Sequence, residues 1–385
     1  LRARDVKTGG NFYIYDVEKQ NIIDALEYEG EQMLAGFSPD SKKLGLVRDN
    51  NLFVYFIENK ELKQLTNDGS EEIISGNFDW VYEEEFSIIK GWDWSPDSKK
   101  IAFWRLDQSK VPEIKVAKWD SLYFNFIEMR YPKAGGPSSE VKIGVVDIQT
   151  GNKNWINFEN DSDYYIPRME FTADPNIVSV QKLNRLQNNL ELYLYDIEND
   201  KKKLVLEEKD EHWVDVYDDL TFLQDQRLFI WSSRKNGYKH LYLYDYEGNQ
   251  VKQLTKGKWE LDNLEAVNED TEEIYFTSNK RGTIYKDLYK TNFDGDEAEL
   301  LTEGTGTHSI TASPNGKYFI DSYSSVKNMP VAKVITEDGE EVENLVENDM
   351  SKLEGYEISE MEFIQFEAAD GVKLNAAMIK PHDFD

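Results

Sequence analysis

The sequence contains no cysteine and only four histidines, and both shortages restrict its chemistry. Without cysteine there can be no disulfide, no thiolate zinc site and no cysteine nucleophile. The histidines lie far apart in the sequence and never show the His-x-x-x-His or His-Glu-x-x-His spacing of a metal site. We therefore expect no bound metal, and structural or surface roles for His212, His240, His308 and His382.

Positive charge is also scarce, since Lys and Arg number 44 against 74 Asp and Glu, for a net charge of −30. Nucleic acids and anionic membrane surfaces are bound through clusters of Lys and Arg, so neither is an expected partner. No apolar run reaches the roughly 18 residues that a membrane-spanning helix needs, and no membrane span is predicted.

Two motifs of catalysis and nucleotide binding are missing as well. Gly-x-Ser-x-Gly, the turn that exposes the nucleophile of many serine hydrolases, does not occur, so we expect no catalytic residue in this chain. The segment Gly304-Thr305-Gly306 lacks the lysine and the strand-to-helix context of a phosphate-binding loop, and we interpret it as a turn. No cofactor is expected.

The sequence does contain a repeating β pattern. Its 22 Tyr, 19 Phe and 9 Trp favour strands over helices. Ser-Pro-Asp/Asn turns begin at Ser38, Ser95 and Ser313, and strands ending in Tyr-x-Tyr-Asp and segments ending in Leu-Thr recur between them. From Phe222 to Val267 to Ala312 equivalent positions recur every 45 residues, the length of a propeller blade, whereas a β-sandwich would need no such repeat. This predicts an all-β fold, a β-propeller of about seven to eight four-stranded blades, partly truncated at the N-terminus.

The early blades are longer than this repeat, and one insertion contains an unusual acidic turn. Glu83, Glu84 and Glu85 stand in a row among aromatic residues. In a helical turn Glu84 and Glu85 can point toward one cavity. Close carboxylates repel one another unless an amine, a metal or an arginine lies between them, so they suggest a cation site. The alternative is a solvated acidic turn, which so acidic a composition produces easily.

A second insertion, at about residues 107–137, has aromatic residues for which a regular blade has no place. Such a surplus indicates either a contact surface for a partner or a cover packed between blades. The residues are Trp119, Tyr123, Phe124 and Phe126.

Several strings, in the same order along nearly the whole chain, resemble the dipeptidyl peptidase IV family. The most specific are DWVYEEE at residues 79–85 and YPKAG at residues 131–135. The others are WSP at 94–96, VP at 111–112, NGYKH at 236–240 and KGKWE at 256–260.

This resemblance implies roles for particular residues. Glu84 and Glu85 would bind the free α-ammonium group of a peptide substrate, with Glu83 beside them. Arg4 would contact the carbonyl oxygens of the substrate, and Trp213 would form a wall of the site. The second insertion would be an arm used in homodimerisation, through Trp119, Tyr123, Phe124 and Phe126.

The resemblance also implies two domains. Residues 1–360 would form the propeller, and residues 361–385, two alternating strands around an Asp-Gly turn, would begin an α/β-hydrolase domain. Because the chain begins at Leu1 rather than Met, we expect it to be a piece of a longer protein.

The whole protein would be a serine-type dipeptidyl peptidase that releases X-Pro or X-Ala dipeptides from peptides with a free N-terminus. It would work in the periplasm, in the cell envelope or outside the cell, although the sequence leaves the cytoplasm open. The piece alone would be inactive. Two alternatives remain, a non-catalytic propeller used for binding or assembly and an endo- or tripeptidyl relative that reuses the acidic turn.

Overall fold

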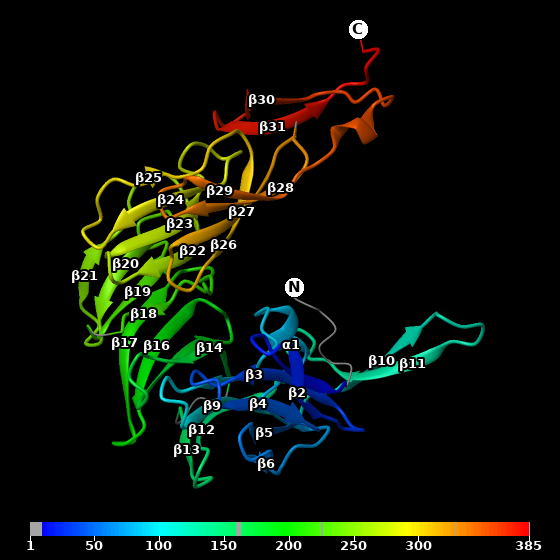
Figure 1. The fold of residues 1–385 in the computed structure, drawn as a ribbon, viewed down its shortest axis with the longest axis vertical. Coiled ribbons are helices and arrows are strands. Elements are labelled where there is room, and N and C mark those ends of the chain that lie inside the picture. The colour runs from blue at the N-terminus through cyan, green and yellow to red at the C-terminus, as the bar shows by residue number, and fades with distance from the viewer. Residues whose placement is uncertain (1–9, 159–162, 225, 327, 385) are drawn as a thin grey trace. The chain divides into compact units, whose positions relative to one another are not determined.

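The computed structural model describes residues 10–158, 163–224, 226–326 and 328–384, and these are almost entirely antiparallel β-structure (Figure 1). The chain divides into two compact units. The first comprises residues 1–216, 224–227 and 246–248, and the second comprises residues 217–223, 228–245 and 249–385. In most sheets each strand pairs with its neighbours in sequence, which is the topology of a propeller blade.

The first unit contains three blade sheets, a shorter sheet and a hairpin. The shorter sheet consists of β1 (Phe12–Asp16) and β2 (Asn21–Leu26), and the first blade of β3 (Gln32–Phe37), β4 (Lys43–Arg48), β5 (Asn51–Phe56) and β6 (Glu61–Gln64). The next sheet joins β7 (Ile73–Ser75), β9 (Lys100–Asp107), β12 (Glu140–Asp147) and β13 (Lys153–Ile156), and β8 (Trp92–Trp94) also pairs with β9. The last blade consists of β14 (Tyr164–Phe171), β15 (Ile177–Asn184), β16 (Asn189–Asp196) and β17 (Lys201–Lys209).

The second unit contains three blade sheets followed by a hairpin. The first sheet consists of β18 (Thr221–Phe222), β19 (Leu228–Ser233), β20 (His240–Asp245) and β21 (Gln250–Gln253). The second consists of β22 (Leu261–Asn268), β23 (Glu273–Ser278), β24 (Asp287–Asn292) and β25 (Glu299–Leu300). The third consists of β26 (Thr307–Ala312), β27 (Tyr318–Ser324), β28 (Val331–Thr336) and β29 (Glu341–Val346). A 3₁₀ turn at Met350–Leu353 leads to a hairpin of β30 (Met361–Glu367) and β31 (Lys373–Ile379).

These sheets confirm the predicted all-β propeller. Together with the β1–β2 sheet, the part of the chain that the structure describes contains seven blade-like units. Apolar side chains fill the space between neighbouring sheets, as in the cluster of Val47, Leu52, Trp92, Ile101 and Phe103. Burial of such side chains is the main source of stability for stacked sheets.

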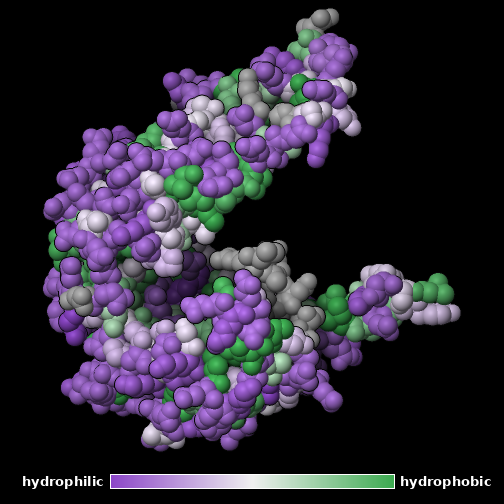
Figure 2. All heavy atoms as spheres, in the orientation of Figure 1, coloured by the Kyte–Doolittle hydropathy of each residue, from purple (hydrophilic) through white to green (hydrophobic). Residues whose placement is uncertain are grey.

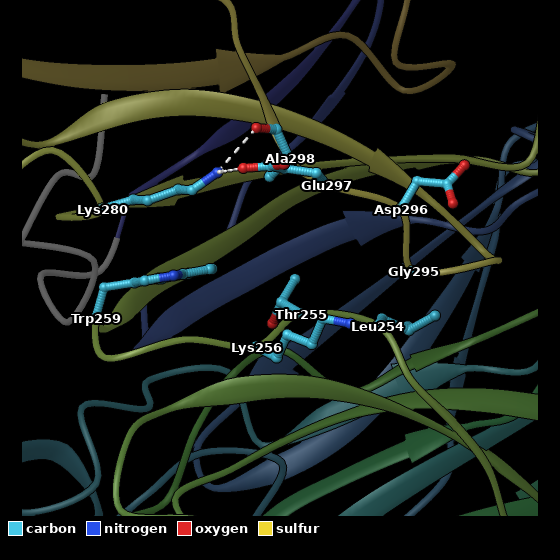
Figure 3. A pocket seen from close by; sticks show the side chains of 9 residues that line it. All are labelled: Leu254, Thr255, Lys256, Trp259, Lys280, Gly295, Asp296, Glu297 and Ala298. Atoms are coloured by element: carbon cyan, nitrogen blue, oxygen red, sulfur yellow. Dashed lines mark hydrogen bonds and ion pairs between the residues drawn. The ribbon is translucent and has the colours of Figure 1, made fainter.

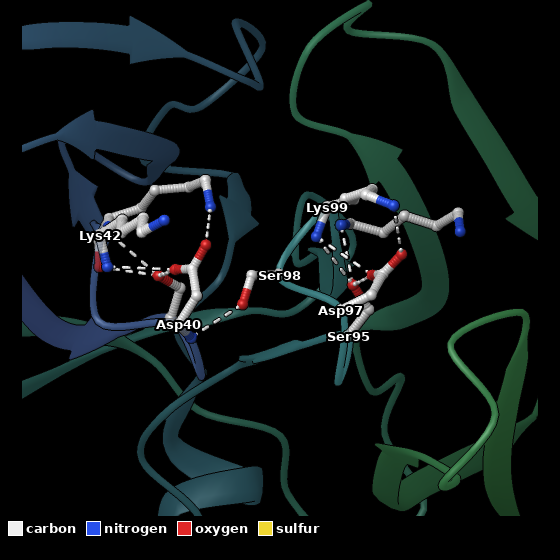
Figure 4. A network of polar contacts seen from close by, with 9 residues as sticks. Asp40, Lys42, Ser95, Asp97, Ser98 and Lys99 are labelled. Atoms are coloured by element: carbon white, nitrogen blue, oxygen red, sulfur yellow. Dashed lines mark hydrogen bonds and ion pairs between the residues drawn. The ribbon is translucent and has the colours of Figure 1, made fainter.

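The Ser-Pro turns share one hydrogen-bond arrangement, part of which is drawn in Figure 4. The Oγ atom of Ser95 accepts from the backbone N–H of Lys100 at 2.9 Å and donates to Asp97 Oδ1 at 2.7 Å. Ser38 and Ser313 make the same pair of contacts in their own turns. Burial raises the pKa of Asp40 in the Ser38 turn, but hydrogen bonds from Lys43 and Ser38 outweigh it and lower the pKa to about 2.

The Leu-Thr pairs also recur with a common geometry. Thr66, Thr255 and Thr302 are buried, and each hydroxyl accepts the backbone N–H of a leucine near the start of the third strand of its blade. The leucine before each threonine donates its own N–H to the carbonyl of that same third-strand leucine, at 2.8–2.9 Å. Each Leu-Thr pair therefore connects the end of the outer strand to the third strand by hydrogen bonds, which explains why this motif repeats in the sequence.

Candidate functional site

The acidic turn is a single helical turn, α1 (Trp80–Glu84), inserted between β7 and β8. Asp79 caps its N-terminus, because Oδ1 of Asp79 accepts from the backbone N–H of Tyr82 at 3.1 Å. The turn closes where the N–H of Glu85 donates to the carbonyl of Val81 at 2.8 Å. Glu84 is thus the last residue of the helical turn, and Glu85 is its C-terminal cap.

Two glycines bring the two ends of this insertion together. The N–H of Gly91 donates to the carbonyl of Gly76 at 3.0 Å, and Gly76 has a φ of 84°. A Cβ atom at Gly91 would lie 2.8 Å from the backbone carbon of Gly76, closer than real side chains come. Only glycine permits this approach, which fixes where α1 leaves and rejoins the blade.

Buried aromatic rings support α1 from behind. Tyr82 is 1% exposed, stacks on Phe78 at 5.2 Å and contacts Phe86 at 5.4 Å between ring centroids. Its hydroxyl accepts the backbone N–H of Ile166 in β14 at 3.1 Å. Burial raises the pKa of Tyr82 well above its usual value, so the phenol stays neutral and serves as a fixed anchor.

The carboxylates of Glu84 and Glu85 lie at the open end of α1. Both side chains are exposed, and within the described residues neither has a hydrogen bond or an ion pair. Glu83 is half-buried against the blade. Two adjacent carboxylates without a partner can together accept the hydrogens of one ammonium group. The sequence suggested that both carboxylates point toward one cavity, whereas both side chains are exposed in the structure.

One arginine lies beside the C-terminal end of α1. Nη1 of Arg168, in β14, donates to the carbonyl of Phe86 at 3.1 Å. A positive charge at this end is favourable, because the last carbonyls of a helical turn carry partial negative charge. The sequence interpretation missed Arg168, since nothing in its local pattern connects it to a turn more than 80 residues earlier.

The segment that follows the second insertion also contacts α1. Ser139 donates its hydroxyl to Oδ2 of Asp79 at 2.5 Å, and the ring of Tyr131 packs on Trp80 at 4.3 Å between centroids. Asp79 therefore uses one carboxylate oxygen to cap the helix and the other to bind this segment. YPKAG at residues 131–135 was the signal that could have identified the segment, but the string alone assigned it no role.

The two other residues predicted for the substrate site are Arg4 and Trp213. Arg4 lies outside the described residues. Trp213 is 53% exposed in the segment between β17 and β18, where its N–H donates to Asp210 Oδ1 at 3.3 Å. No contact joins Trp213 to Glu84 or Glu85 in the part of the chain that the structure describes.

Two of the four histidines have defined structural surroundings. The ring nitrogens of His240 lie 3.1 Å from Thr255 Oγ1 and 3.1 Å from the carbonyl of Gly257, and burial lowers the pKa of His240. His308 is buried with its Nδ1 2.8 Å from Oδ1 of Asp321. Within the described ranges, no group of three or more His, Asp or Glu side chains is suited to hold a metal ion.

A cavity of about 490 Å³ lies in the second unit, between the segment after β21 and the turn before β25 (Figure 3). Figure 3 shows Trp259 and Lys280 along its walls, with Lys280 directed to Glu297 and Ala298. Nζ of Lys280 donates to the carbonyl of Ala298 at 3.0 Å and lies 3.8 Å from Glu297. The charge of Lys280 is therefore compensated within the protein.

The second insertion forms a hairpin of β10 (Glu113–Lys118) and β11 (Asn125–Arg130), which pair only with each other in the described sheets. Figure 1 shows this hairpin extending from its blade, and Figure 2 shows hydrophobic atoms at its tip. The aromatic residues are exposed rather than packed between blades, which contradicts the inter-blade cover. Their exposed fractions are 77% for Trp119, 84% for Tyr123, 47% for Phe124 and 55% for Phe126.

The helices that the structure describes include none long and apolar enough to cross a membrane.

Comparison with known proteins identifies the family. Residues 4–330 match the family model "Dipeptidyl peptidase IV (DPP IV) N-terminal region". The chain belongs to this family. It is also similar to the crystal structure of Porphyromonas gingivalis dipeptidyl peptidase 4, with a TM-score of 0.91 and 32% identity over 97% of this chain and 54% of that chain.

Curated dipeptidyl peptidases are similar over the same length. The "Probable dipeptidyl-aminopeptidase B" of Phaeosphaeria nodorum is 28% identical over 97% of this chain and 45% of that protein. The "Dipeptidyl peptidase 4" of Trichophyton rubrum is 26% identical over 97% of this chain and 51% of that protein. The chain thus spans about half the length of the curated relatives it matches.

Proposed function

We propose that this chain is the substrate-recognising propeller of a serine-type dipeptidyl peptidase that removes X-Pro or X-Ala dipeptides from free peptide N-termini. Glu84 and Glu85 bind the α-ammonium group of the substrate, with Glu83 beside them. Arg4 contacts a substrate carbonyl and Trp213 borders the site, as the family resemblance implies. The catalytic serine belongs to a hydrolase domain that begins with residues 361–385, so residues 1–385 are inactive alone.

The single observation that carries the proposal is the pair of exposed carboxylates at the end of a rigidly supported turn. Glu84 and Glu85 have no hydrogen bond or ion pair within the described residues, whereas Asp40 and Asp97, in the Ser-Pro turns, accept hydrogen bonds from their serines. A carboxylate pair held in place by buried aromatic rings is suited to bind a cation that comes from outside the chain.

The chemistry of the pair explains why the products would be dipeptides. Two carboxylates can accept all three hydrogens of a primary ammonium group and neutralise its charge. If the nucleophile of the hydrolase domain lies at a fixed distance from them, cleavage falls after the second residue. A peptide with a blocked amine cannot form these charge-assisted hydrogen bonds and is held less well.

The proposal extends to assembly and compartment. The exposed aromatic residues of the β10–β11 hairpin would be the contact surface of a homodimer, since an aromatic cluster at the tip of a projecting hairpin is costly to leave in water. By resemblance, the protein would act on peptides in the periplasm, in the cell envelope or outside the cell.

Substitution of the two carboxylates in the full-length protein tests the amine-binding role. Glu84→Gln and Glu85→Gln keep the shape of each side chain and remove its charge. We expect each change to lower kcat/KM for a chromogenic Gly-Pro substrate roughly ten- to hundredfold, because hydrogen bonds between charged groups are lost. Asp68→Asn, which alters an exposed carboxylate bonded to Arg105, is the control and should leave kcat/KM unchanged. Normal activity in both glutamine variants would refute the role.

A further inference from the structure

A single helical turn cannot hold its own shape, because one turn gains too few hydrogen bonds to offset the ordering of its backbone. The geometry of α1, and with it the position of Glu84 and Glu85, must therefore come from contacts with other segments. Hydrogen bonds and ring contacts among the described residues point to two such segments. One is β14, which contacts the Tyr82 hydroxyl and the Phe86 carbonyl through Ile166 and Arg168.

The other segment is residues 131–139, which runs from the end of the β10–β11 hairpin to β12 and is here called the return segment. It contacts the first residues of α1. Ser139 is 7% exposed, and its hydroxyl donates to the 8% exposed Asp79 at 2.5 Å. Tyr131 packs its ring on Trp80 at 4.3 Å with the planes tilted by 48°.

The return segment is itself firmly attached to the first unit. Nη2 of Arg185 donates to the carbonyl of Gly136 at 2.9 Å, and Nη1 of Arg185 donates to Ser138 and to Asp163. The N–H of Tyr131 donates to the carbonyl of Pro112 at 3.0 Å. The adjacent serines thus have different tasks, because Ser138 fixes the return segment to Arg185 while Ser139 connects it to α1.

We infer that Ser139 and Tyr131 are positioning residues for the amine-binding carboxylates. Ser139 holds the Asp79 carboxylate in the orientation in which its other oxygen caps α1, and Tyr131 fixes Trp80 at the first position of the turn. This inference rests on the proposed function of Glu84 and Glu85. Because the return segment starts at the base of the β10–β11 hairpin, it also joins the proposed dimer arm to the amine site through one short stretch of chain.

The inference predicts an effect on substrate binding rather than on the chemical step. Ser139→Ala leaves Asp79 with one partner fewer and loosens the cap, so Glu84 and Glu85 occupy the productive position less of the time. In the full-length protein we expect KM for the Gly-Pro substrate to rise about five- to tenfold while kcat stays within about twofold. Ser139→Thr keeps the hydroxyl, so its KM should stay close to that of the parent protein.

A matched control separates this effect from a general loss of stability. Ser179 is also a buried serine of the first unit, and its hydroxyl donates to the carbonyl of Glu170 at 3.1 Å rather than to a residue of α1. Ser179→Ala removes a similar hydrogen bond and should leave KM unchanged. Thermal unfolding of both alanine variants shows whether their losses of stability are comparable.

Glu84→Gln, measured in the same assay, separates a failure of the positioning role of Ser139 from a failure of the proposed amine-binding function. If Glu84→Gln is impaired and Ser139→Ala is not, the positioning role is overturned while the proposed function stands. If neither variant is impaired, the proposed function fails. The positioning role is also overturned if KM rises equally in Ser179→Ala, or if KM rises in Ser139→Thr as much as in Ser139→Ala. Should Ser139→Ala not fold, Tyr131→Leu tests the same inference with the same expected rise in KM.

Discussion

The two insertions on either side of β9 use the same kinds of side chain in opposite ways. In the α1 insertion the aromatic rings face inward, and Phe78 and Tyr82 are each 1% exposed. In the β10–β11 hairpin they face outward, and Trp119 and Tyr123 are 77% and 84% exposed. The difference shows that aromatic content alone does not reveal a role. A short insertion closed by Gly76 and Gly91 packs back on its blade, whereas a long two-stranded one leaves it.

The two insertions are also suited to bind different kinds of partner. The inward rings of α1 make a rigid support on which two carboxylates can be held in place. The outward rings of the hairpin contact one another, Trp119 with Phe124 at 4.8 Å and Phe124 with Phe126 at 5.5 Å, and together form an apolar surface. We therefore propose binding of a small charged group at one insertion and binding of a protein surface at the other.

The largest expected difference between the insertions is in stability. Tyr82→Ala empties a fully buried site and removes the hydrogen bond from Ile166, so we expect it to lower the free energy of unfolding by about 3–5 kcal/mol. Trp119→Ala removes a larger side chain from a site that is exposed in the single chain, and it should change the free energy of unfolding of the monomer by less than about 0.5 kcal/mol. Urea denaturation followed by circular dichroism provides the measurement. Similar losses of unfolding free energy in the two variants would contradict the proposed difference between the two insertions.

A smaller effect is expected on self-association, and only from the hairpin. Trp119→Glu combined with Phe124→Glu places charges in the apolar surface and should shift the full-length protein from dimer toward monomer in sedimentation velocity, with the blades still folded. Leu186→Glu, at another exposed apolar residue of the first unit, is the control and should leave the sedimentation coefficient unchanged. A parent protein that is already monomeric, or a dimer that survives the double change, contradicts the proposed arm.

The blades could be predicted from sequence because their signals are local. A Ser-Pro-Asp turn is determined by bonds among residues within five positions of one another, as at Ser95, Asp97 and Lys100. The Leu-Thr pairs recur for the same reason, since each connects neighbouring strands of one blade. A helical turn at Glu84 was considered from the sequence, and the local signal for it, which was not used, is Asp79, a typical N-terminal cap.

The supports of the candidate site could not be predicted in the same way. Ser139 contacts Asp79 across 60 residues, and Arg168 contacts Phe86 across 82. No local pattern encodes such contacts, because they depend on how the return segment and β14 lie against the insertion. The opposite burial of Tyr82 and Tyr123 escaped prediction for the same reason. Composition identified aromatic-rich insertions, but only the folded chain separates the inward set from the outward one.

Recognition of a free amine by Glu84 and Glu85 can be tested by comparing two substrates. The full-length protein is given a chromogenic Gly-Pro substrate and its N-acetylated form at equal concentration, and initial rates are measured. We expect the free substrate to be cleaved and the acetylated one to be cleaved at least about a hundredfold more slowly, because acetylation removes the charge that the carboxylates bind. Equal rates for the two substrates would contradict it.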